Sequence, residues 1–355
     1  MAEDHASESQ SGPQPQPPHE HAQPAGEAST RTPAGPILIL GGTGGFGGAM
    51  ARELAGRGYN LRLVARDIDR ARVRFGNRSN VEYAREDALN ADDIGRLATG
   101  CSVIVHGVNV PYHKWSQTMT VATDHVIAAA RQHNATILFP GNVYGLGEQF
   151  DQPLDESAEK LATTTKGRLR NELEGKLQQA TEDGATRVII VRAGDFFGPT
   201  VRNGLVDPIF RHAGLGKPIR VIGRLDVPHQ WAYVPDLARA AADLLDMAGR
   251  LEPFEVVHFK GHVASSTGEF IRTIASIAGR ADLPIRRVSW LKLRLAGVFS
   301  PMARELLELR YLFDRAVVLD DGKLRRLLPD FEDTPLDTAI RETIAGAQSA
   351  PPARR

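Results

Sequence analysis

The stretch from Ile37 to Gly47 constrains the fold most, because it joins an apolar run to three glycines spaced as Gly41-x-x-Gly44-x-x-Gly47. Helix-forming residues follow directly. This order predicts a β-strand, a tight turn and a helix. Glycine lets the backbone of such a turn approach a pyrophosphate, whose charge meets the unpaired N–H groups of the helix start. The sequence therefore predicts a dinucleotide site formed by Gly41, Thr43, Gly44, Gly45, Phe46 and Gly47.

Short runs of branched apolar residues alternate with helical stretches along the first half of the chain. The runs that predict strands are 61–64, 80–83, 102–105, 136–139 and 187–191. Two intervening stretches, 118–133 and 157–180, are long enough for crossover helices. Right-handed crossovers between parallel strands give a sheet with helices on both faces, and ligands bind at the carboxyl ends of its strands. The expected fold class is α/β, with a Rossmann-type doubly wound parallel sheet.

The pattern divides the chain into four parts. Residues 1–35 are rich in Pro, Gln and Ser and lack an apolar run, so we expect a disordered tail. Residues 36–193 carry the nucleotide-binding Rossmann domain. Residues 194–347 predict a smaller carboxyl-terminal α/β substrate lobe, interleaved with the Rossmann core, and 348–355 a second tail. In the lobe we expect helices near 235–247, 267–278 and 290–313.

Composition excludes several classes of protein. The formal net charge of the 355 residues is zero at pH 7, which does not suggest a nucleic-acid binder. Cys101 is the only cysteine, which excludes an internal disulfide and a cysteine-based zinc site and fits a reducing compartment. There is no secretion signal and no apolar run of about 18 residues. We expect a cytoplasmic protein that does not associate with membranes.

Two alternatives concern the carboxyl-terminal half. Residues 290–299 mix Lys292 and Arg294 with large apolar side chains, a composition that also suits binding to a membrane surface. We expect instead an amphipathic helix that packs on its own domain. His229, Asp236 and Glu269 lack the spacing of metal ligands, so no metal site is predicted.

Further motifs follow the glycine turn in a characteristic order. They are Asn142-Val143-Tyr144-Gly145, the run 191–199, the run 231–238, and Lys323-Leu324 followed by Thr334-Pro335-Leu336. With these motifs the chain from about Pro36 to Ile344 resembles the extended short-chain dehydrogenase/reductase family, the NAD(P)-dependent epimerase/dehydratases. The resemblance implies an oxidoreductase or epimerase that acts on a small carbonyl compound or a nucleotide-linked sugar. It also implies homodimerisation through the helices 118–133 and 157–180, with which their apolar spacing is compatible.

The end of the second predicted strand favours NADP over NAD. An NAD enzyme places a carboxylate there, whereas this chain has Ala65 followed by Arg66. The Arg66 guanidinium suits a 2′-phosphate, and Arg70 and Arg72 follow on the next helix. Asp67 either caps that helix or reaches a ribose hydroxyl, so NAD stays the alternative. The resemblance implies further cofactor contacts at Asp87, Ala88, Gly107, Val108 and Pro140.

The catalytic Tyr-x-x-x-Lys of the family is absent, because no Lys in the chain has a Tyr four positions before it. The best alignment pairs Thr164 and Arg168 with the motif, and Pro140 stands where a Ser or Thr is usual. A threonine hydroxyl cannot replace a phenol as an acid at neutral pH. We expect other groups near the nicotinamide to move the proton: Tyr144, Asn142, Lys166 and His106. The resemblance places Asp195 and Arg192 beside the substrate.

Three readings of this departure stay open. In the first, the protein is an atypical reductase or epimerase, since loss of a proton donor lowers a rate by about 10² to 10⁴ without abolishing it. In the second, it binds NADP without catalysis and reports the redox state to a partner. In the third, it has lost activity and keeps a structural role. We expect the first, because a substrate lobe follows the cofactor domain.

Overall fold

A computed structural model describes residues 35–65, 67–85, 87, 89–202 and 206–349. All of them belong to one compact unit. The two predicted tails, 1–35 and 348–355, lie almost entirely outside the described residues, and the division between Rossmann domain and substrate lobe stays a prediction.

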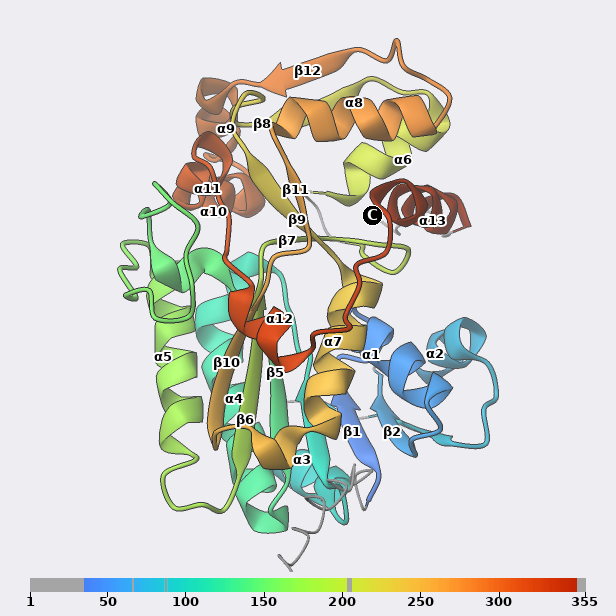
Figure 1. Ribbon diagram of the computed structural model, residues 1–355, viewed down its shortest axis with the longest axis vertical. Coiled ribbons are helices and arrows are strands. Elements are labelled where there is room, and N and C mark those ends of the chain that lie inside the picture. Colours follow the sequence, from blue (N-terminus) through green and yellow to red (C-terminus); the bar gives the residue numbers. More distant parts are fainter. Residues whose placement is uncertain (1–34, 66, 86, 88, 203–205, 350–355) are drawn as a thin grey trace, which may run out of the picture. The chain divides into compact units, whose positions relative to one another are not determined.

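A parallel sheet of seven strands forms the centre of the fold (Figure 1). Its order is β10-β6-β5-β4-β1-β2-β3, and every neighbouring pair is parallel. The order reverses between β1 and β4, which is where ligands bind in open sheets of this kind. The predicted α/β fold class is confirmed. The strands are β1 (Ile37–Leu40), β2 (Leu61–Val64), β3 (Val81–Ala84), β4 (Val103–His106), β5 (Thr136–Asn142), β6 (Arg187–Ala193) and β10 (Phe254–Phe259).

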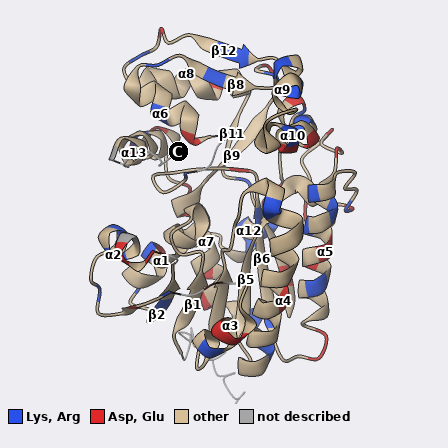
Figure 2. Cartoon of the chain, turned by 180° about the vertical axis from the view of Figure 1, so that it is seen from behind, with Lys and Arg blue, Asp and Glu red and all other residues tan. Residues whose placement is uncertain are grey.

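Helices cover both faces of this sheet because β1 is apolar on both sides. Ile37 and Ile39 belong to one core, with α1 (Gly45–Gly56) and α7 (Val234–Asp246). Leu38 and Leu40 belong to the other, with the helices seen in front in Figure 2. These are α3 (Ala91–Ala98), α4 (Trp115–His133) and α5 (Thr165–Gln179), while α2 (Ile68–Phe75) follows β2.

Helix α5 begins eight residues after the predicted start at 157, for a local reason. The Thr164 hydroxyl accepts a hydrogen bond from the Gly167 amide at 3.1 Å and thereby caps the helix. Both β10 and α7 come from the part of the chain beyond residue 194, yet β10 pairs with β6 and α7 packs against α1. The carboxyl-terminal part thus contributes to the main sheet and its cover.

The other carboxyl-terminal elements surround a separate aromatic core. Trp231 stacks on Phe270 with ring centroids 4.4 Å apart, and Phe197 stacks on Phe210 at 5.6 Å. These rings belong to a second group of small sheets and helices, at the top of Figure 1. Its strands are β7 (Asp195–Phe197), β8 (Ile219–Ile222), β9 (His229–Tyr233), β11 (His262–Ala264) and β12 (Ile285–Val288), and its helices α6 (Asp207–Leu215), α8 (Thr267–Ile277) and α13 (Leu336–Ser349).

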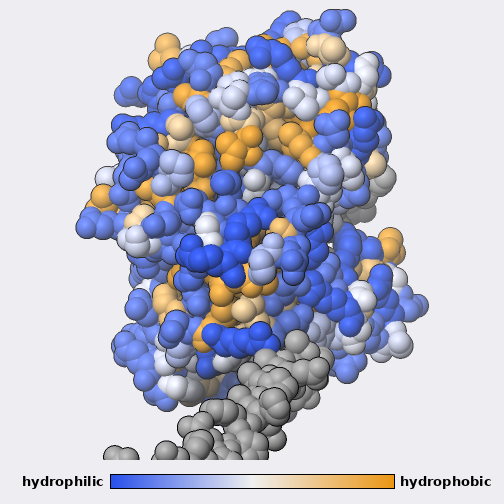
Figure 3. All heavy atoms as spheres, in the orientation of Figure 1, coloured by the Kyte–Doolittle hydropathy of each residue, from blue (hydrophilic) through white to orange (hydrophobic). Residues whose placement is uncertain are grey.

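The predicted helix 290–313 is three helices: α9 (Trp290–Ala296), α10 (Pro301–Glu308) and α11 (Arg310–Asp314). Pro301 opens α10 and Ser300 caps it, which breaks the helix there. Helix α9 has no buried residue. It still packs against α10, and the Trp290 and Phe313 ring centroids are 6.1 Å apart, so the expected packing on its own domain is present on one side of the helix only. Figure 3 shows apolar side chains at the surface in the upper part of the view. No helix among the described residues is long and apolar enough to span a membrane.

Candidate functional site

The glycine turn joins β1 to α1 with very close backbone contacts. Gly41 has a φ of +69°, and its carbonyl accepts a hydrogen bond from the Gly44 amide at 2.8 Å. A Cβ at Gly41 would lie 2.2 Å from the Gly107 carbonyl oxygen, and one at Gly47 would lie 2.5 Å from the Gly41 oxygen. Only glycine permits this approach of β1, α1 and the end of β4.

The start of α1 is open to an anion. Its N-cap, Gly44, is exposed and provides no side chain for capping. The first N–H groups of a helix have no partner within the helix and carry the positive end of its dipole. Thr43 and Gly45 are partly exposed beside them, whereas Phe46 is buried. The turn thus provides backbone donors suited to a pyrophosphate.

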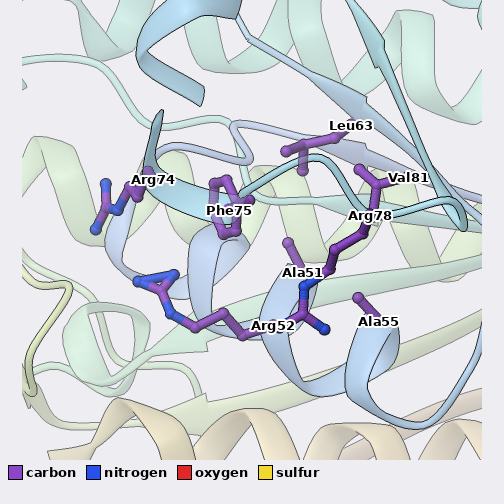
Figure 4. Close-up of a pocket in the computed structure, with 8 residues that line it drawn as sticks. All are labelled: Ala51, Arg52, Ala55, Leu63, Arg74, Phe75, Arg78 and Val81. Atoms are coloured by element: carbon purple, nitrogen blue, oxygen red, sulfur yellow. The ribbon is translucent and has the colours of Figure 1, made fainter. Parts of the chain in front are cut away.

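A basic cavity of about 220 Å³ lies between α1, α2 and the edge of the sheet (Figure 4). Arg74 donates to the carbonyl of Thr43 in the glycine turn and, at 3.0 Å, to that of Thr200. Burial lowers the pKa of Arg52, and Arg78 and Arg202 nearby lower it further. No carboxylate lines the cavity among the described residues, so an anion is its natural complement. The lining residues are Ala51, Arg52, Ala55, Leu63, Arg74, Phe75, Arg78 and Val81.

Of the other predicted cofactor residues, two lie outside the described residues and three lie in loops after strands. Arg66 and Ala88 lie outside the described residues. The exposed Asp87 accepts a hydrogen bond from the Leu89 amide at 3.0 Å, a local turn contact. Gly107 and Val108 follow β4 directly and are partly exposed. Gly107 lies against the glycine turn, and its amide donates to the Leu40 carbonyl at 3.1 Å.

Helix α5 directs Lys166 and Arg170 inward. Both are buried, whereas Arg168 is exposed and Thr164 is used as the N-cap. The alignment of Thr164 and Arg168 with Tyr-x-x-x-Lys is therefore wrong. Lys166 and Arg170 have the same i, i+4 spacing as that motif, and residues four apart lie on one face of a helix. This spacing was visible in the sequence and was the signal that the alignment missed.

Lys166 is bound by two carboxylates of α10. Its ammonium group pairs with Glu305 and Glu308, and its amide donates to Glu308 at 2.9 Å. Burial by itself would raise the pKa of Glu308, but the hydrogen bonds from Lys166 outweigh it and the pKa is lowered. The ammonium also lies 5.6 Å from the centre of the Tyr112 ring. Lys166 thus joins α5 to α10 next to Tyr112.

Arg170 lies at the carboxyl end of β5 without a full set of partners. Its guanidinium is 4.9 Å from the Trp115 ring centre and 5.1 Å from that of Phe139, and it donates to the Pro140 carbonyl at 3.3 Å. Its Nε is buried without a hydrogen-bond partner among the described residues, as is Nδ1 of His106. Burial, and secondarily Arg170, lowers the pKa of His106 to about 3, so His106 is neutral at neutral pH.

Tyr144 is hydrogen-bonded to a second tyrosine that the sequence analysis did not select. The hydroxyls of Tyr112 and Tyr144 are 2.8 Å apart, and the Tyr144 ring stacks on Trp115 at 6.1 Å. Burial is the main cause that raises both phenol pKa values, and Arg170 opposes the rise. Tyr112 is the more exposed of the two. Its position soon after β4 was the only sequence signal for it, because strand ends of this sheet carry ligand sites.

The remaining predicted residues are Asn142, Asp195 and Arg192, and they have different surroundings. Asn142 accepts a hydrogen bond from the Tyr144 amide at 3.1 Å, so it caps the short 3₁₀ turn Val143–Leu146 and orients Tyr144. Asp195 is partly exposed and lies 3.0 Å from Nε2 of His229. Its negative charge contributes to the raised pKa values of both phenols. Arg192 is buried in an ion pair with Glu174 at 2.8 Å, and its charge is thereby already balanced.

Comparisons with known proteins bear on the family and the fold of the chain. The model of the NAD dependent epimerase/dehydratase family matches residues 37–258. The chain belongs to this family. None of the curated protein sequences compared with this family member matches it.

Solved structures show the same fold. WbmH from Bordetella bronchiseptica, in complex with NAD⁺, has a TM-score of 0.70 and 17% identity, over 89% of this chain and 99% of its own. UDP-glucuronic acid 4-epimerase from Bacillus cereus, in complex with NAD, has a TM-score of 0.71 and 15% identity, over 88% and 98%. A putative epimerase from Burkholderia cenocepacia has a TM-score of 0.69 and 20% identity, over 90% and 99%.

The site fits a nicotinamide dinucleotide in two respects. Side chains at Gly41 and Gly47 would fill the backbone cradle, and the chain keeps glycine at both. On the other side of the β1–β4 reversal, Nε of Arg170 is a buried donor that lacks a partner within the described chain. Buried polar groups usually have a partner, so a bound ligand with hydroxyl or amide oxygens would complete this one. No cluster of acidic, His or Cys side chains in the described residues is suited to a metal ion.

Proposed function

We propose that this epimerase/dehydratase family member is an NADP-dependent oxidoreductase or epimerase in which Tyr112, hydrogen-bonded to Tyr144, moves the proton. The observation that carries the proposal is the 2.8 Å contact between the two hydroxyls, beside the buried guanidinium of Arg170. When bound, the nicotinamide would supply or accept the hydride. The chain supplies the position of the substrate carbonyl and the path of the proton.

Each group in this site has a distinct role. Tyr112 is protonated at neutral pH, since the pKa of an ordinary phenol is about 10 and burial raises that of Tyr112 further, and a protonated phenol can donate to a carbonyl oxygen. Arg170 carries a positive charge that stabilises the phenolate left behind. Tyr144 and Asn142 hold Tyr112 in place through the hydroxyl contact and the capped turn. Lys166, paired with Glu305 and Glu308, is assigned to positioning rather than to proton transfer.

The basic cavity supports NADP over NAD. Arg74 reaches the carbonyl of Thr43 from α2, which brings a guanidinium to the glycine turn. Ala65 leaves the end of β2 without the carboxylate that binds a ribose 2′-hydroxyl. A 2′-phosphate would meet Arg74 there, and Arg66 is the second arginine assigned to it from the sequence. The substrate class is a small carbonyl compound or a nucleotide-linked sugar. Similar structures include one in complex with UDP-glucose and NAD.

Titration with NADPH and NADH, followed by cofactor fluorescence, tests the binding half of the proposal. Gly44→Asp places a carboxylate where the pyrophosphate should lie, and like charges in contact disfavour binding by several kcal/mol, so we expect a loss of about 100-fold or more. Gly56→Asp is the matched control, because it adds the same charge at the other end of α1 in open space. If both variants bind as the unmodified protein does, the glycine turn is not the cofactor site.

Turnover tests the catalytic half. NADPH oxidation would be measured with small carbonyl compounds, and epimerisation with UDP-sugars. We expect Tyr112→Phe to lower kcat by about 100-fold at unchanged NADPH affinity. The control Tyr83→Phe removes a hydroxyl that bonds to Gly76 at the outer edge of the sheet, and should change nothing. Equal turnover of Tyr112→Phe and the unmodified protein would exclude Tyr112 as the proton donor.

A non-catalytic NADP sensor is the second candidate. The ion pairs of Lys166 with Glu305 and Glu308 favour this candidate. Because its ammonium group is already paired, Lys166 does not provide a free ammonium for catalysis. The two candidates share cofactor binding and differ in turnover. Tight NADPH binding without oxidation of the cofactor by any tested carbonyl compound or sugar would favour the sensor.

A further inference from the structure

Residues 290–304, which hold α9 and the start of α10, expose an unusual set of large apolar side chains. The exposed fractions reach 91% at Phe299 and exceed 60% at three others. Scattered exposed apolar residues are normal, but a contiguous patch marks a site of interaction. The members are Leu291 (65%), Leu295 (63%), Val298 (68%), Phe299 (91%) and Met302 (43%).

Four of these side chains share one side because the turn of α9 continues for a few residues beyond Ala296. The amides of Val298 and Phe299 donate to the carbonyls of Leu295 and Ala296 at 3.2 and 3.1 Å. Leu291, Leu295, Val298 and Phe299 are spaced i, i+4, i+7 and i+8, which is the period of one helical face. The extended Ser300 ends this segment, and Met302 is exposed on α10, which packs against α9. The apolar patch therefore lies along one side of α9 and its last turn and includes Met302 of the adjoining helix.

The segment is held by specific contacts on its other side. The Trp290 indole donates to Asp314 at 3.2 Å, and its ring lies 5.3 Å from the Arg310 guanidinium. Ala303 and Leu306 of α10 are buried, and Glu305 of the same helix pairs with Lys166. The apolar side chains are thus displayed by an anchored element.

The charged side chains within the segment are all basic. Between residues 285 and 304 the sequence has no Asp or Glu. Lys292, Arg294 and Arg304 are exposed within the segment, and Arg286 and Arg287 on β12 precede it. Lys and Arg side chains beside an apolar surface keep their charged ends in water at the level of lipid headgroups. An apolar centre with a basic rim is therefore complementary to a bilayer that carries negative charge.

We propose that residues 290–304 dock this protein on the surface of an anionic lipid bilayer. The apolar side chains, led by Phe299, enter the boundary between headgroups and acyl chains, and the basic side chains contact the headgroups. A basic residue near an anionic surface strengthens binding by about fivefold. The proposal does not depend on the cofactor or on turnover.

Vesicle flotation with the full chain tests this proposal. The vesicles contain phosphatidylcholine alone or equal parts of phosphatidylcholine and phosphatidylserine. We expect binding to the anionic vesicles only, with weaker binding at high salt because exposed charges are screened. Val298→Ser with Phe299→Ser should abolish flotation, and Lys292→Glu with Arg294→Glu should weaken it by at least about 10-fold.

Leu215→Ser is the matched control, since Leu215 is an exposed leucine (53%) at the end of α6. It should float as the unmodified protein does, and circular dichroism should show that every variant is folded. Absence of flotation with anionic vesicles, or flotation unchanged by the Val298 and Phe299 substitutions, would overturn the proposal. Self-association in size-exclusion chromatography that the same substitutions abolish, without flotation, would instead assign the patch to a second copy of the chain.

Discussion

The two sides of the β1–β4 reversal differ in how far they keep the pattern of the family. On the β1 side, glycine stands wherever the backbone contacts require it, and α1 begins with uncapped N–H groups. On the β5 side, the i, i+4 pair that faces inward is Lys166 and Arg170, and two tyrosines from different segments meet beside it. The backbone expected to bind the cofactor is kept, whereas the side chains at the proposed reacting end are not a Tyr-x-x-x-Lys pair.

This difference follows from what each side must do. A pyrophosphate is bound by backbone donors, and a wrong residue in the turn would collide with the neighbouring backbone. Proton transfer needs only a hydroxyl of suitable acidity at a suitable place, which residues from other segments can provide. The amino-acid sequence is thus more constrained where backbone groups bind the ligand than where side chains transfer a proton.

The largest effect is expected at Arg170. Arg170→Met keeps a flexible, unbranched stem but removes the guanidinium, with its charge and its donors, at the end of β5. If this side contacts the cofactor, the affinity for NADPH and NADH should fall alike by about 10- to 100-fold, the worth of a charged hydrogen bond. Arg168→Met, on the exposed face of the same helix, is the control. Equal cofactor affinities of the two variants would restrict the cofactor site to the β1 side.

Lys166 should affect stability more than binding. Lys166→Met leaves Glu305 and Glu308 without their cation, and we expect the free energy of unfolding to fall by about 2 kcal/mol. Urea unfolding measures the change, and cofactor affinity should stay the same. In the control, Lys176→Met, the surface pair with Asp124 is lost, which should alter stability by less than about 1 kcal/mol. A loss of turnover in Lys166→Met without a loss of stability would make Lys166 part of the catalytic apparatus.

A smaller and more selective effect is expected at Arg74 on the β1 side. Arg74→Ala should weaken NADPH about 10-fold and leave NADH unchanged, because only NADPH carries the 2′-phosphate. Arg72→Ala removes an arginine of the same helix that lies over the Tyr83 ring, and should have little effect on either affinity. Equal weakening of both cofactors by Arg74→Ala would remove the argument for NADP.

The smallest effect concerns pH and His106. Its pKa is about 3 in the folded chain and about 6.5 in an unfolded one, so only the unfolded state takes up a proton as the pH falls below 6.5. The free energy of unfolding should therefore fall by about 1 kcal/mol from this residue between pH 6.5 and 5.5. His106→Asn should remove that part of the loss in unfolding curves at the two pH values. An unchanged pH dependence would mean that His106 takes up a proton as readily in the folded state as in the unfolded state.

The sequence predicted the strands and the glycine turn correctly, but it did not predict which side chains meet at the proposed catalytic end of the site. The strands 61–64 and 136–139 and the glycine turn lie where the apolar pattern placed them, because a doubly covered parallel sheet requires continuous apolar runs. The inward face of α5 was misaligned by two residues, since Thr164 is both a good cap and a member of a repetitive Thr run. Tyr112 was missed because its partner Tyr144 lies 32 residues away.

The sequence by itself determined the fold class, the glycine cradle and the family, because strand period, turn chemistry and glycine sterics act between neighbours in the chain. Only the tertiary structure decided which polar side chains meet. In the folded chain Lys166 pairs with α10, and Arg192 is buried in an ion pair with Glu174. The apolar side of α9 remains exposed. These outcomes depend on contacts between distant segments, and the local pattern of a sequence does not specify such contacts.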